Sequence, residues 1–226
     1  MKPKFYLLIL FAFSCPYWMV AQSQESIIPL SVTENLPLIT KFEVMPLEEL
    51  ENCLDETVSH PEFTKFACPL YVNLRPDNSG EWTETPNGRI WRLAIRSPNA
   101  HSLYISLHFS LHPEARLFIY DPKFDYLRGA YTALNNNSVE ILTVAPVQGE
   151  ELIVELNLPP TQRIYGKLQV TKVYHDFYNV FKERLSSARK LPNGNKCEED
   201  INCINGQFWQ TEKRAVCKII TNGGIG

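Results

Sequence analysis

An excess of either charge is missing from this sequence, and that absence excludes a broad class of function. The 22 Lys and Arg residues are slightly outnumbered by 25 Asp and Glu residues, which gives a formal net charge of −3. A domain that binds nucleic acid normally carries a basic excess that neutralises phosphates. Bulk charge therefore argues against DNA or RNA, and no nucleic-acid partner is expected.

The sequence also lacks the local signatures of common enzymes. It contains no G-x-S-x-G nucleophile elbow, no phosphate-binding loop, no dinucleotide fingerprint and no C-x-x-C pair. One alternative is a metal-dependent hydrolase that uses His108 and His112, which are four residues apart. Both fall at a predicted strand edge that faces solvent, so ordinary surface histidines are the favoured interpretation. No metal and no cofactor are expected.

Long apolar runs are confined to the amino terminus. Lys2 and Lys4 precede the apolar stretch 5–13, and polar residues follow Ala21. This order is typical of a secretory signal peptide, and the run is shorter than the roughly 20 residues that a membrane span needs. We therefore expect cleavage near Ala21, secretion to the periplasm or the medium, and no stable membrane anchor after cleavage. A lipoprotein signal, the alternative, would use Cys15.

Cysteine is sparse, and its count becomes odd once the signal peptide is removed. Six cysteines are present, and loss of Cys15 leaves five. Cys53 and Cys68 could pair, and closing so short a loop would stabilise the fold by roughly 3 kcal/mol. Five residues separate Cys197 from Cys203 and no histidine lies near them. Disulfides to cysteines elsewhere are therefore a better interpretation of this pair than a zinc site.

Alternating apolar residues fill the middle of the chain. Every second residue from Leu103 to Leu111 is apolar, which predicts a half-buried strand. Turn residues such as those at 135–137 and 159–160 separate further candidates. The predicted strands are 65–74, 89–97, 101–111, 116–120, 126–134, 139–144, 151–158 and 167–174. Short strands at roughly ten-residue spacing predict an all-β fold, an antiparallel β-sandwich or jelly roll.

The sequence changes period after this region. Apolar residues after Asp176 predict a helix over 176–190 with Asp176 as its cap. A basic, turn-rich linker then leads into 191–226, a segment too short to fold alone without staples. We therefore expect it to be the opening of a further domain.

Scattered matches in the body and one cysteine motif share a likeness to a known family. The motif is Cys197-x₂-Asp200-x₂-Cys203, followed by Gly206, Trp209 and 215–216. The body matches are 80–82, 90–97, Ala100, Leu103, 115–121, 128–132, 149–156 and Pro159. Together these residues resemble the pro-region and the start of the mature domain of secreted bacterial lysyl endopeptidase-like serine proteases. The similarity runs from about Phe66 to the end, and the cysteine motif is its most specific part.

The resemblance implies three regions: a signal peptide at 1–21, a β-sandwich pro-domain at 22–190, and a truncated stub of a trypsin-like β-barrel at 191–226. The catalytic His, Asp and Ser of the family have no counterpart here, so the chain is expected to be inactive as a peptidase. Its expected partner is the protease domain of the complete precursor, which the pro-domain would help to fold and hold inactive. Cys197 and Cys203 would pair with cysteines of the missing part, and Cys217 would be a buried apolar residue.

The resemblance also gives the basic linker a role. A lysine-specific protease can process its own precursor, and Lys190-Leu191 is the expected scissile bond, six residues before Cys197. The neighbouring candidates are Arg189-Lys190 and Lys196-Cys197. The rival interpretation is a stand-alone secreted β-sandwich that binds a carbohydrate or a cell-surface partner. It predicts that residues 22–190 bind a ligand with no protease present.

Overall fold

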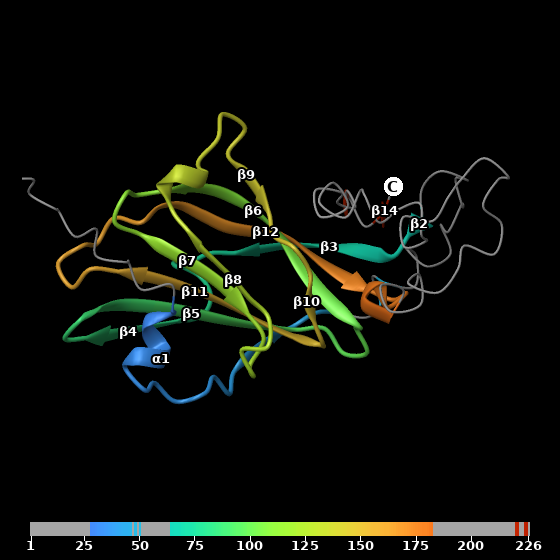
Figure 1. Cartoon of the computed structure of the whole chain (residues 1–226), viewed down its shortest axis with the longest axis horizontal. Helices are drawn as coiled ribbons and strands as arrows, with labels where there is room; N and C mark the ends of the chain where they lie inside the picture. The colour runs from blue at the N-terminus through green and yellow to red at the C-terminus, as the bar shows by residue number, and fades with distance from the viewer. Residues whose placement is uncertain are drawn as a thin grey trace, which may run out of the picture.

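Two β-sheets stacked on each other form the main body of the chain (Figure 1). The computed structural model describes residues 28–46, 48, 50, 64–182, 220, 221, 224 and 225. Within these residues, no helix is long and apolar enough to cross a membrane. The predicted signal peptide, most of the predicted helix at 176–190, and the linker after it lie outside them.

Short strands dominate the described residues, and helical geometry is confined to short stretches. These stretches include α1 (Leu30–Thr33) and the 3₁₀ turn η1 (Ala133–Asn135). The strands are β1 (Phe42–Val44), β2 (Thr64–Lys65), β3 (Ala67–Leu74), β4 (Glu81–Thr85), β5 (Gly88–Arg96), β6 (Ser102–Leu111), β7 (Arg116–Tyr120), β8 (Leu127–Tyr131), β9 (Ile141–Thr143), β10 (Val147–Gln148), β11 (Glu151–Leu158), β12 (Gly166–Asp176), β13 (Ile220–Thr221) and β14 (Gly224–Ile225).

The first sheet has the order β1-β5-β11-β7-β8, and β4 pairs with the part of β5 that β1 leaves free. Its pairings are antiparallel except for β1, which runs parallel to β5. The second sheet has the order β10-β6-β12-β3, and β9 also pairs with β6. Because neighbouring strands in each sheet include segments far apart in sequence, the fold depends on long-range pairing and not on hairpins alone.

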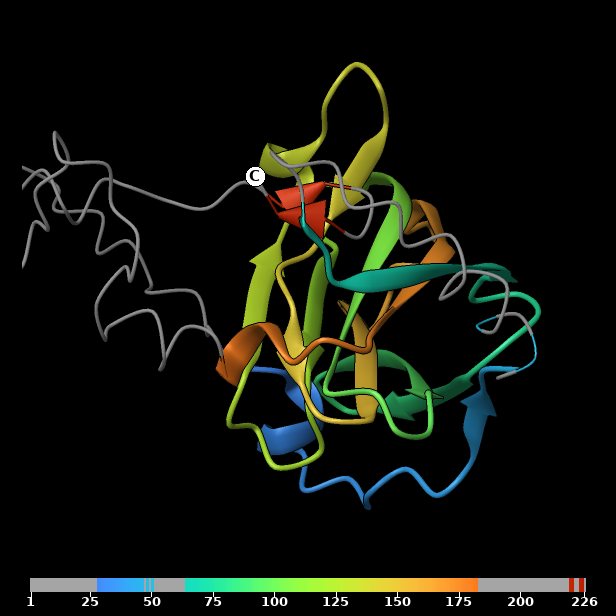
Figure 2. The same cartoon turned by 90° about the vertical axis from the view of Figure 1, so that its right-hand side faces the viewer.

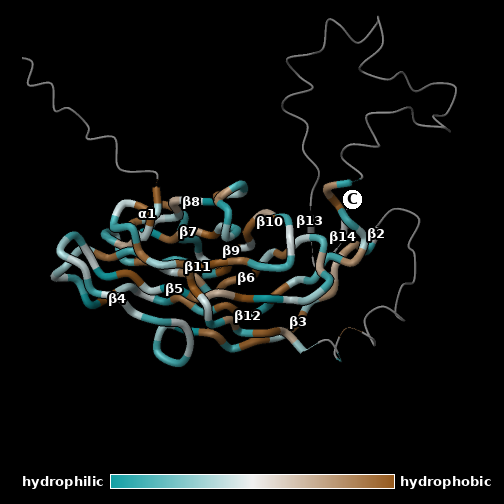
Figure 3. Tube along the Cα trace, turned by 90° about the horizontal axis from the view of Figure 1, so that it is seen from below, coloured by the Kyte–Doolittle hydropathy of each residue, from teal (hydrophilic) through white to brown (hydrophobic). Residues whose placement is uncertain are grey.

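The main core lies between the two sheets. It takes alternate residues from β5, β6, β7, β11 and β12, which is the pattern expected when one face of each strand packs on the opposite sheet. Figure 3 shows apolar residues recurring along the strands of both sheets. Among the core residues are Trp91, Leu93, Ile95, Leu103, Ile105, Leu107, Phe109, Leu117, Ile119, Val154, Leu156, Val170 and Val173.

The outer faces of both sheets are partly covered as well. On the first sheet, the segment 28–46, called here the amino-terminal strap, packs Ile39 and Phe42 on a cluster that includes Phe118 and Ile153. The strap runs along one side of the body in Figure 2. On the second sheet, Tyr104 and Tyr174 stack with ring centroids 4.2 Å apart and pack with Phe66 and Val180.

The structure bears out the all-β prediction and corrects several details. Predicted strands 116–120 and 151–158 coincide with β7 and β11. The strand at 101–111 was predicted to be half-buried, but Ser102, Tyr104 and Ser106 on its second face are buried too. The cause is the second cluster, which covers that face. The predicted helix at 176–190 also starts late, because β12 continues to Asp176 and helical geometry begins at Val180.

Candidate functional site

Most residues predicted to be functional lie outside the described residues. They are Ala21, Cys53, Lys190, Leu191, Cys197, Cys203 and Cys217. Cys68 is the exception: it is fully buried in β3 and is engaged in a disulfide. Its partner cysteine lies outside the described residues, so the pairing of Cys68 with Cys53 stays a prediction.

His108 and His112 make separate contacts and do not form one site. His108 Nε2 lies 3.0 Å from Glu140 Oε2, whereas the ring nitrogens of His112 lie 3.3 and 3.4 Å from Gln162 Nε2. Within the described residues, no group of three or more His, Cys, Asp and Glu side chains is placed to hold a metal ion. The geometry therefore gives no support to a hydrolase built on this histidine pair.

A third histidine, His175, forms a buried pair with Ser97 at one end of the main core. Ser97 Oγ lies 2.8 Å from His175 Nδ1, and the serine is fully buried. The neighbouring Asp176 does not orient this histidine, because its carboxylate accepts hydrogen bonds from Ser102 Oγ and from the backbone amides of 178–180. A catalytic nucleophile must be accessible to its substrate. Because Ser97 is fully buried, the pair is not a catalytic dyad. Its hydrogen bond links the end of β5 to β12 and so joins the two sheets.

Asp176 holds the turn that leads out of the body. Its Oδ1 accepts from the amides of Tyr178 and Asn179 at 2.9 and 2.8 Å, and its Oδ2 accepts from Val180 at 3.1 Å. These contacts match the cap role predicted for Asp176, although the helical turn begins later than expected. The contacts fix the direction in which the chain leaves toward the predicted cleavage bond.

Glu155 anchors the amino-terminal strap on the first sheet. Its carboxyl group is fully buried and accepts hydrogen bonds from Ser31 N, Ser31 Oγ, Tyr120 OH and Asn157 Nδ2 at 3.0, 2.5, 2.6 and 2.7 Å. Burial, and then the charge of Glu155, raise the pKa of Tyr120 well above its usual value. Tyr120 therefore stays a protonated donor, and two of the four donors to Glu155 come from the strap.

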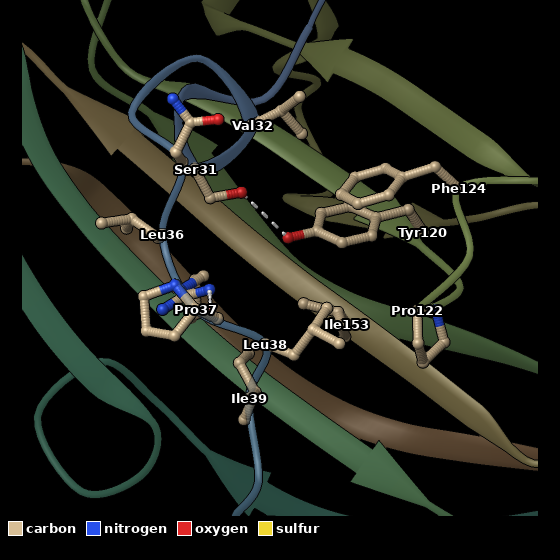
Figure 4. Close-up of a pocket in the computed structure, with 12 residues that line it drawn as sticks. Ser31, Val32, Leu36, Pro37, Leu38, Ile39, Tyr120, Pro122, Phe124 and Ile153 are labelled. Carbon is tan, nitrogen blue, oxygen red and sulfur yellow. Dashed lines mark hydrogen bonds between the residues drawn. The ribbon is translucent and has the colours of Figure 1, made fainter.

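A small hollow lies between the strap and the first sheet (Figure 4). It encloses about 190 Å³ and is lined by mainly apolar side chains, including Leu36, Ile39 and Ile153. The ring of Phe124 stacks on Tyr120 at 4.4 Å and closes one side. Ligand pockets usually exceed about 300 Å³. The hollow therefore has room for one side chain and not for a whole small-molecule substrate.

Residues 132–141, called here the projecting loop, stand out from the body at the top of Figures 1 and 2. Three of its apolar side chains face solvent: Leu134 is 96% exposed, Val139 is 69% exposed and Ile141 is 56% exposed. Single exposed apolar residues are ordinary, but a group of three on one loop is typical of an interaction site. The sequence analysis placed these three residues in the predicted strands 126–134 and 139–144, with a turn only at 135–137. In the structure β8 ends at Tyr131 and β9 begins at Ile141, so the loop is longer than predicted and its exposed residues were missed.

The other notable feature is a small separate sheet. β14 pairs antiparallel with β2, with Gly224 opposite Lys65 and Ile225 opposite Thr64, and β13 pairs with β14. This sheet joins the segment predicted to begin a second domain to the strand that leads into β3. No sequence signal predicted the pairing, because it links residues that precede the main body in sequence with residues that follow it.

No protein-family model matches the chain, and no solved structure matches it. Inference about its function therefore rests on the contacts of Glu155 and Asp176, the projecting loop and the small sheet.

Proposed function

We propose that this chain is the amino-terminal part of a secreted serine protease precursor. Residues 22–190 act as a pro-domain that binds the protease domain, assists its folding and holds it inactive until cleavage after Lys190. The body of this pro-domain is a β-sandwich of jelly-roll type. Chemistry in the described residues supports a binding role, since the buried Ser97 and His175 pair is inaccessible to a substrate.

The observation that carries the proposal is the pairing of β14 with β2. The segment 191–226 resembles the start of a trypsin-like domain, and its β14 forms backbone hydrogen bonds with Thr64 and Lys65 of the body. Pairing of strand edges is a common way for one protein segment to recognise another, because backbone groups supply the affinity. A pro-domain that holds the first residues of its protease by such pairing is placed to guide the folding of the rest of the protease domain.

A stand-alone binding module is the second candidate function. The projecting loop, with three exposed apolar side chains, favours it, because such a loop can contact any suitable partner. The two candidates differ in the partner that they require. A pro-domain binds a trypsin-fold protease, whereas a stand-alone module binds a carbohydrate or cell-surface ligand with no protease present.

Calorimetric titration separates the two. The secreted chain is titrated into a lysyl-specific, trypsin-fold protease whose nucleophilic serine is replaced by alanine, so that the chain is not digested. We expect saturable one-to-one binding. If no heat of binding appears with the protease while the chain binds a glycan array, the precursor proposal is wrong and the module is favoured.

A further inference from the structure

The projecting loop exposes three large apolar side chains to solvent. Leu134 lies just after the start of η1 and is 96% exposed, while Val139 and Ile141 come within seven residues of it. Exposing leucine costs free energy in water, because burial of its side chain would be favourable by roughly 2 kcal/mol. Each of the three residues is more than half exposed, so the exposed surface is available to a partner.

The loop is held in one shape by hydrogen bonds from three consecutive asparagines. Asn135 Oδ1 accepts from Thr132 N at 2.9 Å and closes a capping box at η1. Asn136 bonds both backbone groups of Leu111, at 2.8 and 3.0 Å, and so ties the loop to the end of β6. Asn137 Nδ2 donates to Ile141 O at 2.9 Å. A loop already fixed in its bound shape loses little conformational entropy on binding.

Charged groups at the base of the loop are already paired. Lys167 Nζ donates to both carboxylate oxygens of Glu140 at 2.8 Å, and His108 contacts the same carboxylate. The hydrogen bond from Lys167, and then that from His108, lower the pKa of Glu140. Attraction to an anionic membrane would need cations that face the lipid. The paired base and the net charge of −3 favour a protein pocket over a bilayer.

The position of the loop indicates which protein supplies that pocket. Figure 1 shows the projecting loop at the top of the body and the β2–β14–β13 sheet beyond its right-hand end, and Figure 2 shows that sheet in the upper half, below the loop. The strand β14 belongs to the segment proposed to begin the protease domain. A domain continuing from this segment would start beside the upper half of the body, the half from which the loop projects. The amino-terminal strap, by contrast, lies on the opposite, lower side.

We propose that the projecting loop is a second contact between the pro-domain and the protease domain, in which Leu134 enters an apolar pocket of the protease and Val139 and Ile141 pack at its rim. This inference rests on the proposed function and adds the partner surface to it. It predicts that affinity depends on a side chain whose removal leaves the fold of the body unchanged.

The test compares two exposed leucines. Leu134→Asp and Leu38→Asp each place a carboxylate on an exposed position, since Leu38 on the strap is 71% exposed. The full secreted chain and both variants are titrated calorimetrically into the serine-to-alanine lysyl-specific protease. We expect L134D to bind about 10- to 100-fold more weakly than the wild type, and L38D to bind as the wild type does. Thermal melting of all three should agree.

The possible failures are distinguishable. If the wild type binds the protease and L134D binds equally well, the loop inference is wrong and the proposed function stands. If the wild type does not bind at all, both are wrong. Binding of the wild type to anionic lipid vesicles, or self-association in sedimentation, that disappears in L134D would also overturn the inference, since either outcome assigns the loop to a different partner.

Discussion

Ser31 Oγ donates a hydrogen bond to Glu155 Oε2 at 2.5 Å and links two residues that are 124 positions apart. The backbone N–H of Ser31 donates to the other carboxyl oxygen at 3.0 Å. Because Glu155 is fully buried, loss of these donors would leave its carboxyl group with two of its four hydrogen bonds, those from Tyr120 and Asn157, in a setting that water does not reach. The contact therefore decides whether the amino-terminal strap stays on the first sheet.

Replacing this serine should destabilise the body. Ser31→Ala removes one donor to the buried carboxyl group, and we expect the free energy of unfolding to fall by about 1 to 3 kcal/mol. Thr33→Ala is the matched control, because its hydroxyl bonds the exposed backbone of Leu30 in the same helical turn. Urea unfolding of the two variants measures the difference. Equal midpoints for S31A and T33A would contradict the assigned role of Glu155.

The buried His175 should make stability depend on pH. Burial lowers its pKa below the usual 6.5, opposed by the charge of Asp176, with smaller effects from His101 and Glu150. The unfolded chain therefore binds the proton more readily than the folded chain. The stability that comes from burying neutral His175 is fully present above the pKa of the unfolded state. It is lost as the pH falls through that value toward the lower pKa of the folded state.

The measurement is urea unfolding at about pH 7.5 and about pH 5.5, which bracket the usual pKa of histidine. We expect the wild type to lose more stability over this interval than His175→Gln, which carries no titratable group at position 175. His101→Gln serves as a comparison at a neighbouring histidine. The same loss of stability in the wild type and in H175Q would show that His175 is not the titrating group.

Two glycines with similar backbone geometry should respond differently to alanine. Gly166 and Gly149 have φ angles of +94° and +106°, which L residues rarely adopt. A Cβ at Gly166 would lie 2.1 Å from Ser110 O, whereas a Cβ at Gly149 would meet nothing within 4 Å. We expect Gly149→Ala to cost about 1 kcal/mol and Gly166→Ala about 3 kcal/mol or more, since overpacking adds to the strain. Thermal melts that coincide for the two variants would contradict this.

Cleavage by a lysyl-specific protease should begin after Lys190. Lysines in the strands, such as Lys167 and Lys172, lie in a folded body that must open before a protease can cut it. Mass spectrometry of early digestion products should therefore show a fragment ending at Lys190. Lys190→Gln should slow its appearance, while Lys196→Gln should leave it unchanged. A first cut elsewhere, with K190Q digested like the wild type, would contradict the predicted processing site.

The strands of the body could be predicted from sequence because their alternation is local. Apolar residues at every second position of β6 and β11 define a core face whatever the rest of the chain does. The strand β4 was missed, since Glu81–Thr85 has one large apolar residue, Trp82, and therefore no alternating pattern. Its place in the sheet depends on pairing with β5.

The anchors and surfaces were less predictable. Glu155 occupies an outward position on β11, where sequence alternation predicts contact with solvent. Its burial results from the docking of Ser31, which local patterns cannot reveal. The exposure of Leu134 was missed for a related reason. The turn-forming asparagines at 135–137 were recognised in sequence, but how far the loop stands out depends on the hydrogen bonds of Asn136 to Leu111.

The most direct test of the account is whether this chain silences a protease. Initial rates of hydrolysis of a small chromogenic lysine amide are measured with an active lysyl-specific, trypsin-fold protease at increasing concentrations of the folded chain, which carries Lys190→Gln so that it is not cut at the predicted site. We expect saturable inhibition by this chain, with a higher inhibition constant when Leu134→Asp is added and an unchanged one when Leu38→Asp is added. Rates that stay constant at every chain concentration would contradict the proposal that the body is an inhibitory pro-domain.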